Sequence, residues 1–130
     1  MVKRKSRVEI IEETANFYNL TNRGYDDSID QCVYKNGEDK KCAVGRCLNS
    51  ETTPHNIFKF RGDAEDLESF CISQDIFLED LFLEQYKGHK IEFWMDLQNF
   101  HDKHEYWNED GLTEGGLVMK EQLLNDWSKD

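Results

Sequence analysis

The most distinctive stretch of the sequence runs from Cys32 to Leu48 and reads CVYKNGEDKKCAVGRCL. It holds three of the four cysteines, arranged around Asn36-Gly37, a pair that tolerates the positive φ angles of a tight turn. The β-branched and aromatic Cys32–Tyr34 segment favours a strand, and Lys41–Val44 is expected to return as its partner. The pattern therefore predicts a β-hairpin.

Helical patterns flank this hairpin on both sides. Residues 6–20 place apolar side chains on one helical face behind Ser6, which suits an N-cap. After the hairpin we expect a helix capped by Asp63, one from Ser73 to Gly88, one over residues 90–105 and one capped by Thr113. The Gly115-Gly116 pair weakens the start of the last helix, and Ile57–Phe60 is a candidate third strand. The sequence predicts a mainly helical α+β fold with about four to five helices and one short hairpin.

Composition narrows the class of protein. One domain over residues 1–130 is expected at this length, with residues 1–5 forming a flexible basic N-terminus. The net charge of −11 argues against nucleic-acid binding, which needs basic side chains to neutralise phosphates. No apolar run is long enough to span a membrane or to act as a signal peptide, so we expect a cytoplasmic protein with reduced cysteines.

The cysteine spacing, C-x9-C-x4-C from Cys32 to Cys47, differs from the paired short spacings typical of zinc sites. We therefore predict buried thiols, with no metal or cofactor, and keep a structural metal as the alternative. A nucleophilic Cys42 is a second alternative, which needs a nearby base such as a histidine. His101 and His104 are three residues apart, so they form either a two-imidazole site or a solvated helix face.

Two binding surfaces are predicted. Tyr34, Lys41 and Arg46 flank the bend at Cys42 and Gly45, where a tyrosine and two cations can receive a small anion such as a phosphate or nucleotide. The alternative is that these residues simply flank a turn. Acidic clusters recur along the chain and either form a solvated surface or occupy a basic cleft on another protein, as nucleic acid would.

The hairpin residues resemble a widespread group of small, uncharacterised proteins encoded mostly by tailed bacteriophages and prophages. The resemblance is carried by Asn22-Arg23-Gly24-Tyr25, Cys32-x-Tyr34, Gly37, Cys42-Ala43-Val44-Gly45-Arg46, the segment Leu97-Gln98-Asn99-Phe100-His101-Asp102 and Trp107. The chain departs from that pattern at Cys47-Leu48-Asn49-Ser50, where many members have an apolar run and a Pro-Asp turn. The resemblance implies a phage origin and an accessory role directed at the host.

Together these observations predict a non-enzymatic, acidic phage-type protein that acts by binding in the host cytoplasm. It is expected to inhibit a host defence protein or to sequester a small anionic signalling ligand, without contacting nucleic acid or membrane. The alternatives are a structural or regulatory protein with a phage partner, and a small enzyme that uses Cys42 or the His101–His104 pair.

Overall fold

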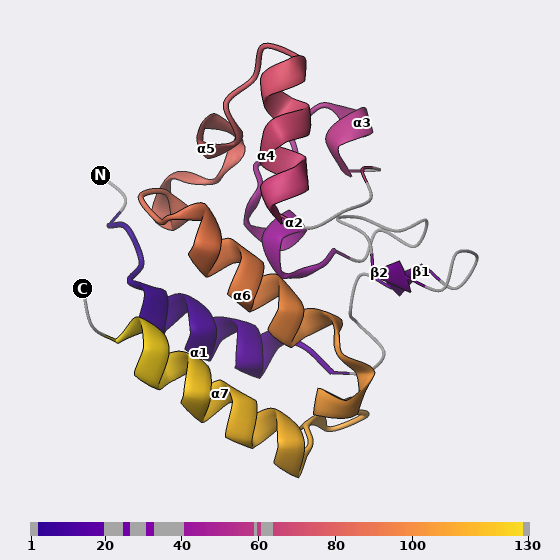
Figure 1. Cartoon of the computed structure of the whole chain (residues 1–130), viewed down its shortest axis with the longest axis vertical. Helices are drawn as coiled ribbons and strands as arrows, with labels where there is room; N and C mark the ends of the chain where they lie inside the picture. Colours follow the sequence, from indigo (N-terminus) through magenta and orange to yellow (C-terminus); the bar gives the residue numbers. More distant parts are fainter. Residues whose placement is uncertain are drawn as a thin grey trace.

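The computed structural model describes residues 3–19, 25–26, 31–32, 41–58, 60 and 64–128, which form a mainly helical α+β fold (Figure 1). The predicted fold class is confirmed. Two short antiparallel pairs complete it: Tyr25 lies opposite Cys32, and Trp107 lies opposite Leu112. The elements in chain order are α1 (Arg7–Phe17), β1 (Tyr25–Asp26), β2 (Gln31–Cys32), α2 (Ala43–Cys47), α3 (His55–Phe58), α4 (Ala64–Ser73), α5 (Leu78–Leu81), the 3-10 helix η1 (Glu84–Tyr86), α6 (Ile91–Asp102), the 3-10 helix η2 (His104–Tyr106), β3 (Trp107–Asn108), β4 (Gly111–Leu112) and α7 (Glu114–Trp127).

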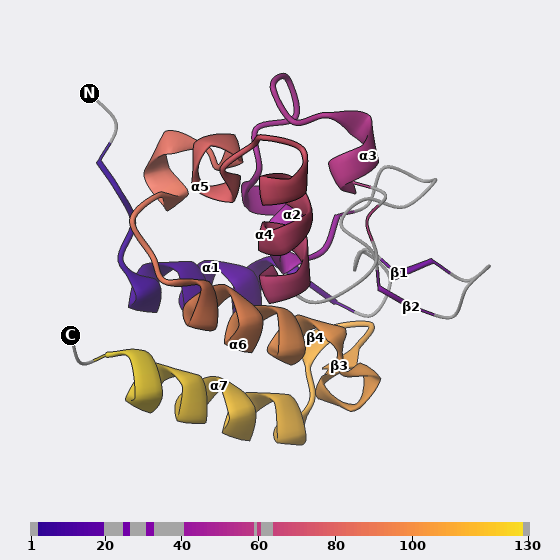
Figure 2. The same cartoon turned by 45° about the horizontal axis from the view of Figure 1, so that its top comes forward.

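Helix α6 lies at the centre, with α4 and α5 on one side of it and α7 on the other (Figures 1 and 2). It also contacts α1 and α2. Its core face carries Phe93, Trp94, Leu97 and Phe100, which are almost completely buried and recur at the helical spacing of three to four residues. Burial of a side chain of this size contributes about 1.5–3 kcal/mol. The predicted helix over residues 90–105 is therefore the core of the fold, although it ends at Asp102.

The first and last helices begin at the predicted caps. The Ser6 hydroxyl accepts a hydrogen bond from the Glu9 amide at 3.1 Å, and the Glu9 carboxylate accepts one from the Ser6 amide at 2.9 Å. The Thr113 hydroxyl accepts from the Gly116 amide at 3.1 Å. These bonds satisfy amide groups that a helix start leaves without intrahelical partners, so both helices begin where the sequence indicates.

The predicted return strand Lys41–Val44 is wrong, because Ala43–Cys47 forms the short helix α2. The Cys42 sulfur caps this helix by accepting a hydrogen bond from the Gly45 amide at 3.3 Å. Strand β2 pairs with β1, which precedes it, and the predicted turn at Asn36-Gly37 lies outside the described residues. Helix α2 places Ala43, Val44 and Cys47 in the core, a burial that an extended strand would not give.

Two further predictions about the middle of the chain are wrong. The candidate strand at residues 57–60 does not form at its first two residues, because Ile57 and Phe58 are buried in the helical turn α3, while residue 59 lies outside the described residues. The helix expected to start at Ser73 does not form, since α4 ends there and Asp75 adopts a left-handed φ of 59° that breaks the helix. The expected cap Asp63 lies outside the described residues.

Within residues 1–5, the predicted flexible basic N-terminus, Arg4 and Lys5 contact the rest of the fold. The Lys5 amide donates to the Gln85 carbonyl at 2.7 Å, and the Lys5 carbonyl oxygen lies 2.9 Å from His89 Nε2. Arg4 pairs with Glu84 at 3.1 Å. These contacts place Arg4 and Lys5 beside η1, and the flexibility of residues 1–5 stays a prediction.

Gly116 gives a direct test of how α7 packs. A Cβ atom at this position would overlap the Tyr106 carbonyl and would lie 2.7 Å from Leu112 Cδ2, whereas the nearest atom to a Cβ at Gly115 is 3.8 Å away. We expect Gly116→Ala to lower the free energy of unfolding in urea by about 2 kcal/mol. Gly115→Ala is the control and should raise it by about 0.5 kcal/mol through helix propensity. Equal stabilities of the two variants would contradict this packing.

Candidate functional site

Four of the five predicted binding residues lie in or beside α2, and the fifth, Tyr34, lies outside the described residues. Cys42 and Gly45 are buried and form the start of the helix. The Lys41 ammonium donates to the Ser50 hydroxyl at 3.2 Å and lies 5.4 Å from the centre of the Phe58 ring. Arg46 faces other partners, so the two predicted cations share no recorded contact.

The cysteines of α2 are poor nucleophiles. Burial, helped by the charge of Asp102, raises the pKa of the Cys42 thiol well above its usual value. Burial also raises the pKa of the Cys47 thiol to about 12. Because the thiolate is the reactive form, both groups remain protonated and unreactive at neutral pH. The enzyme alternative based on Cys42 therefore gains no support from this geometry.

A chain of polar contacts connects α6 to α2. The buried Gln98 accepts a hydrogen bond from the Val44 amide at 3.2 Å and donates to Asp102 Oδ1 at 2.8 Å. The same Asp102 oxygen lies 2.8 Å from Nδ1 of His101, which is completely buried. His101 is thus an interior residue rather than part of a solvated face, and α6 ends before His104. The Gln-x-x-His-Asp segment positions α2 against the core.

Arg46 belongs to a partly buried ionic cluster centred on Glu13. Its Nη1 atom donates to Glu13 Oε1 at 2.7 Å and to the Tyr86 hydroxyl oxygen at 3.2 Å. The Tyr86 hydroxyl donates to the same Glu13 oxygen, and the Lys5 ammonium lies 2.7 Å from Glu13 Oε2. Arg46 is only 15% exposed and stacks near Phe17 and Tyr86.

The charge balance of this cluster favours an ionised Glu13. Burial alone would raise the pKa of Glu13, but hydrogen bonds from Lys5, Tyr86 and Arg46 outweigh it and lower the pKa from 4.5 to about 2. Burial and the hydrogen bond to Glu13 raise the pKa of Tyr86 to about 12. Arg46 Nε and Nη2 are buried without hydrogen-bond partners among the described residues, but Glu13 already offsets the charge of this cation.

Replacement of Glu13 should therefore change the pH dependence of stability. Because its folded pKa lies below the unfolded value, the carboxylate stabilises the fold above about pH 4.5, and this contribution is lost as pH falls towards 2. We expect Glu13→Gln to cost about 1–2 kcal/mol at pH 7, after allowance for partial exposure, in urea unfolding. The cost should shrink towards zero below pH 3.

Glu12→Gln is the matched control on the same helix. Glu12 pairs with Lys120 at 3.4 Å and is 43% exposed, so its loss should change stability by less than about 0.5 kcal/mol. A Glu13→Gln variant whose stability followed the pH profile of the Glu12→Gln variant would contradict the role of the cluster.

Residues 64–86, here called the acidic pole, contain seven carboxylates and no lysine, arginine or histidine. They span α4, α5 and η1, and α4 and α5 lie above α6 in Figure 1. Glu84 pairs with Arg4, and Glu79 accepts a hydrogen bond from the Gly88 amide at 2.9 Å. Two large apolar side chains are exposed here, Ile72 at 58% and Phe77 at 71%. The acidic clusters of α4 and α5 are separate in the sequence, and contacts between these helices bring them together.

A hollow of about 250 Å³ lies between the acidic pole and α6. Phe82 and Trp94 stack within it with ring centroids 4.5 Å apart. The indole Nε1 of Trp94 is buried without a hydrogen-bond partner among the described residues. Carboxylates beside aromatic rings can hold a guanidinium or ammonium group by charge and cation–π attraction. The residues that form this hollow include Glu68, Leu78, Glu79, Phe82, His89 and Trp94.

Comparison of the chain with protein-family models, with curated proteins and with solved structures found no match. Within the described ranges, no three histidine, cysteine, aspartate or glutamate side chains are arranged to hold a metal ion. No helix among those residues is both long and apolar enough to cross a membrane. The geometry of the acidic pole is consequently the main basis for a functional conclusion.

Proposed function

We propose that this protein acts by binding a basic surface of a partner protein through its acidic pole. The observation that carries the proposal is the concentration of seven carboxylates without a basic side chain over residues 64–86. Arg4 forms an ion pair with Glu84 of this segment at 3.1 Å. The remaining carboxylates produce a negative potential that attracts a basic partner and accelerates its association.

Two features of the acidic pole suit a protein partner better than a small ion. Ile72 and Phe77 expose apolar surface next to the carboxylates, and its removal from water on binding contributes about 25 cal/mol per Å². The hollow between the acidic pole and α6 can receive one arginine or lysine side chain, because Glu68, Glu79 and Trp94 line it. A partner that combines basic and apolar side chains fits both features.

The resemblance to phage proteins guides the choice of partner. A phage-encoded acidic protein in the host cytoplasm can inhibit a host defence protein by covering a basic site that would otherwise bind nucleic acid. The charge of −11 is consistent with this mode and unsuited to direct nucleic-acid binding. Sequestration of a small anion has weaker support, because Glu13 offsets the charge of Arg46 and Lys41 lies in other contacts.

A pair of variants with equal net charge tests the proposal. One carries Glu65→Gln, Glu68→Gln and Asp80→Asn in the acidic pole, and the control carries Glu109→Gln, Asp110→Asn and Glu121→Gln near β3, β4 and α7. The probe is the peptide acetyl-Arg-Leu-Arg-Gly-Leu-Arg-amide, measured by calorimetry at low and at physiological salt. We expect the first variant to lose at least about tenfold in affinity and most of its salt dependence.

The affinity of the control variant for the peptide should fall less than about threefold, because salt screens charges that lie far from the binding surface. Equal losses in the two variants would show that total charge, and not the acidic pole, determines binding, and would contradict the proposal. Binding by the wild-type protein that is unchanged by salt would contradict it as well.

A further inference from the structure

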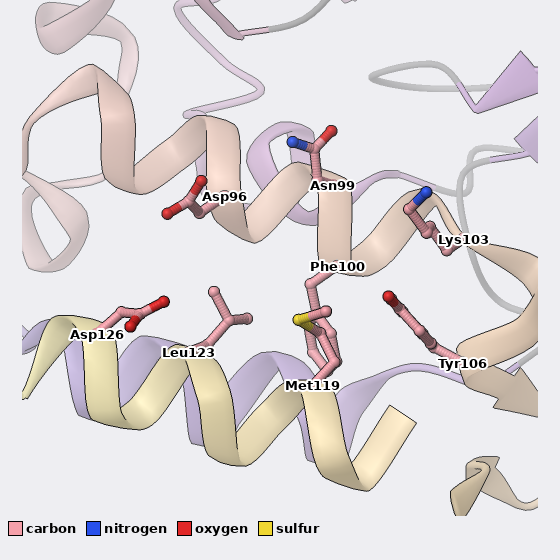
Figure 3. A pocket seen from close by; sticks show the side chains of 8 residues that line it. All are labelled: Asp96, Asn99, Phe100, Lys103, Tyr106, Met119, Leu123 and Asp126. Carbon is pink, nitrogen blue, oxygen red and sulfur yellow. The ribbon is translucent and has the colours of Figure 1, made fainter. Parts of the chain in front are cut away.

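We propose that the cleft between α6 and α7 is a second binding site, for a small organic amine with an apolar body. The cleft has a volume of about 230 Å³ and lies on the opposite side of α6 from α4 (Figures 1 and 3). Asp96 and Asp126 lie at one end of it, on opposite helices, and Tyr106 lies at the other. This site does not depend on the function proposed for the acidic pole.

The floor of the cleft is apolar. Phe100 and Leu123 are almost completely buried, and the half-buried Met119 lines the cleft with them (Figure 3). A methionine side chain is flexible and polarisable, so it adapts its shape to a ring or a branched chain. The volume is smaller than the roughly 300–1,000 Å³ of pockets for drug-sized ligands, which limits the occupant to a small molecule.

The charge at one end of the cleft is held in place without being neutralised. Trp127 Nε1 donates to Asp96 Oδ2 at 3.0 Å, and Gln122 Nε2 donates to Asp126 Oδ1 at 3.1 Å. Both donors are neutral groups, and each carboxylate has an oxygen with no other recorded hydrogen bond. Neither aspartate forms an ion pair within the described part of the chain.

These features specify the chemistry of the occupant. A primary ammonium group offers three donors to the carboxylates at this end of the cleft, while the rest of the molecule covers Phe100 and Met119. The Tyr106 hydroxyl points towards the cleft and can bond to a polar group at the far end, whereas the Lys103 ammonium points away from it (Figure 3). An anionic molecule of the same shape would be repelled by the two aspartates.

Phenethylamine is the probe, and 3-phenylpropionate, which has a similar apolar body and the opposite charge, is its control. The indole N–H signal of Trp127 reports binding by NMR, because this group bonds directly to Asp96. We expect a saturable shift with a dissociation constant at or below about 1 mM for the amine, and no saturable shift for the acid. Absence of saturation with the amine, or equal binding of the acid, would overturn the proposal.

The double variant Asp96→Asn and Asp126→Asn removes both charges and retains oxygen acceptors for Trp127 and Gln122. It should weaken phenethylamine binding at least about tenfold. The single variant Asp126→Asn alters only an exposed side chain, leaves the Trp127 contact intact and should weaken binding about threefold or more. The Glu109→Gln, Asp110→Asn control should bind like the wild type. Unchanged affinity in the double variant would overturn the assignment of the two aspartates.

Discussion

The Glu13 carboxylate is the interaction on which the arrangement of the N-terminal half depends. It forms ion pairs with Lys5, which precedes α1, and with Arg46 in α2, and it accepts a hydrogen bond from the Tyr86 hydroxyl in η1. Arg46 is a largely buried cation, and without a carboxylate its burial would be strongly unfavourable. Gln98 of α6 binds the Val44 amide of α2, so the Glu13 cluster is connected to the central helix through α2.

The same cluster affects how charge is distributed over the protein. The chain has 16 lysines and arginines against 27 aspartates and glutamates. Two of these cations, Lys5 and Arg46, pair with the single carboxylate of Glu13. Residues 64–86 contain seven carboxylates and no lysine, arginine or histidine, and Arg4 pairs with one of these carboxylates, that of Glu84. Concentrated negative charge is unfavourable for the isolated fold through self-repulsion, and a basic partner would relieve that cost.

The sequence predicts those parts of the fold that local rules determine. Helices α1 and α7 begin at Ser6 and Thr113 because hydroxyl caps are local signals, and α6 follows from a long apolar periodicity. Helix α2 is too short for a periodic signal, and it is stabilised by Gln98, which lies 54 residues away in the sequence. The predicted strand at this point failed because tertiary contacts outweighed β propensity.

The candidate sites also combine features that are visible in the sequence with features that only the fold creates. Individual acidic clusters are visible in the sequence, but only the fold joins those of α4 and α5 into one surface beside exposed Ile72 and Phe77. The cleft could not be predicted, because Asp96 and Asp126 belong to different helices and neither lies in a recognisable motif. Of the predicted binding residues, Arg46 and Cys42 are used internally by the ionic cluster and the α2 cap.

The most direct test of the acidic pole is an NMR titration of the isotope-labelled protein with the arginine- and leucine-containing peptide at low salt. We expect saturable shifts concentrated in residues 64–86 and in the indole N–H of Trp94, with little change in the acidic residues near β3 and β4. Shifts spread evenly over all acidic surfaces, or confined to the β3–β4 and α7 region, would contradict this expectation.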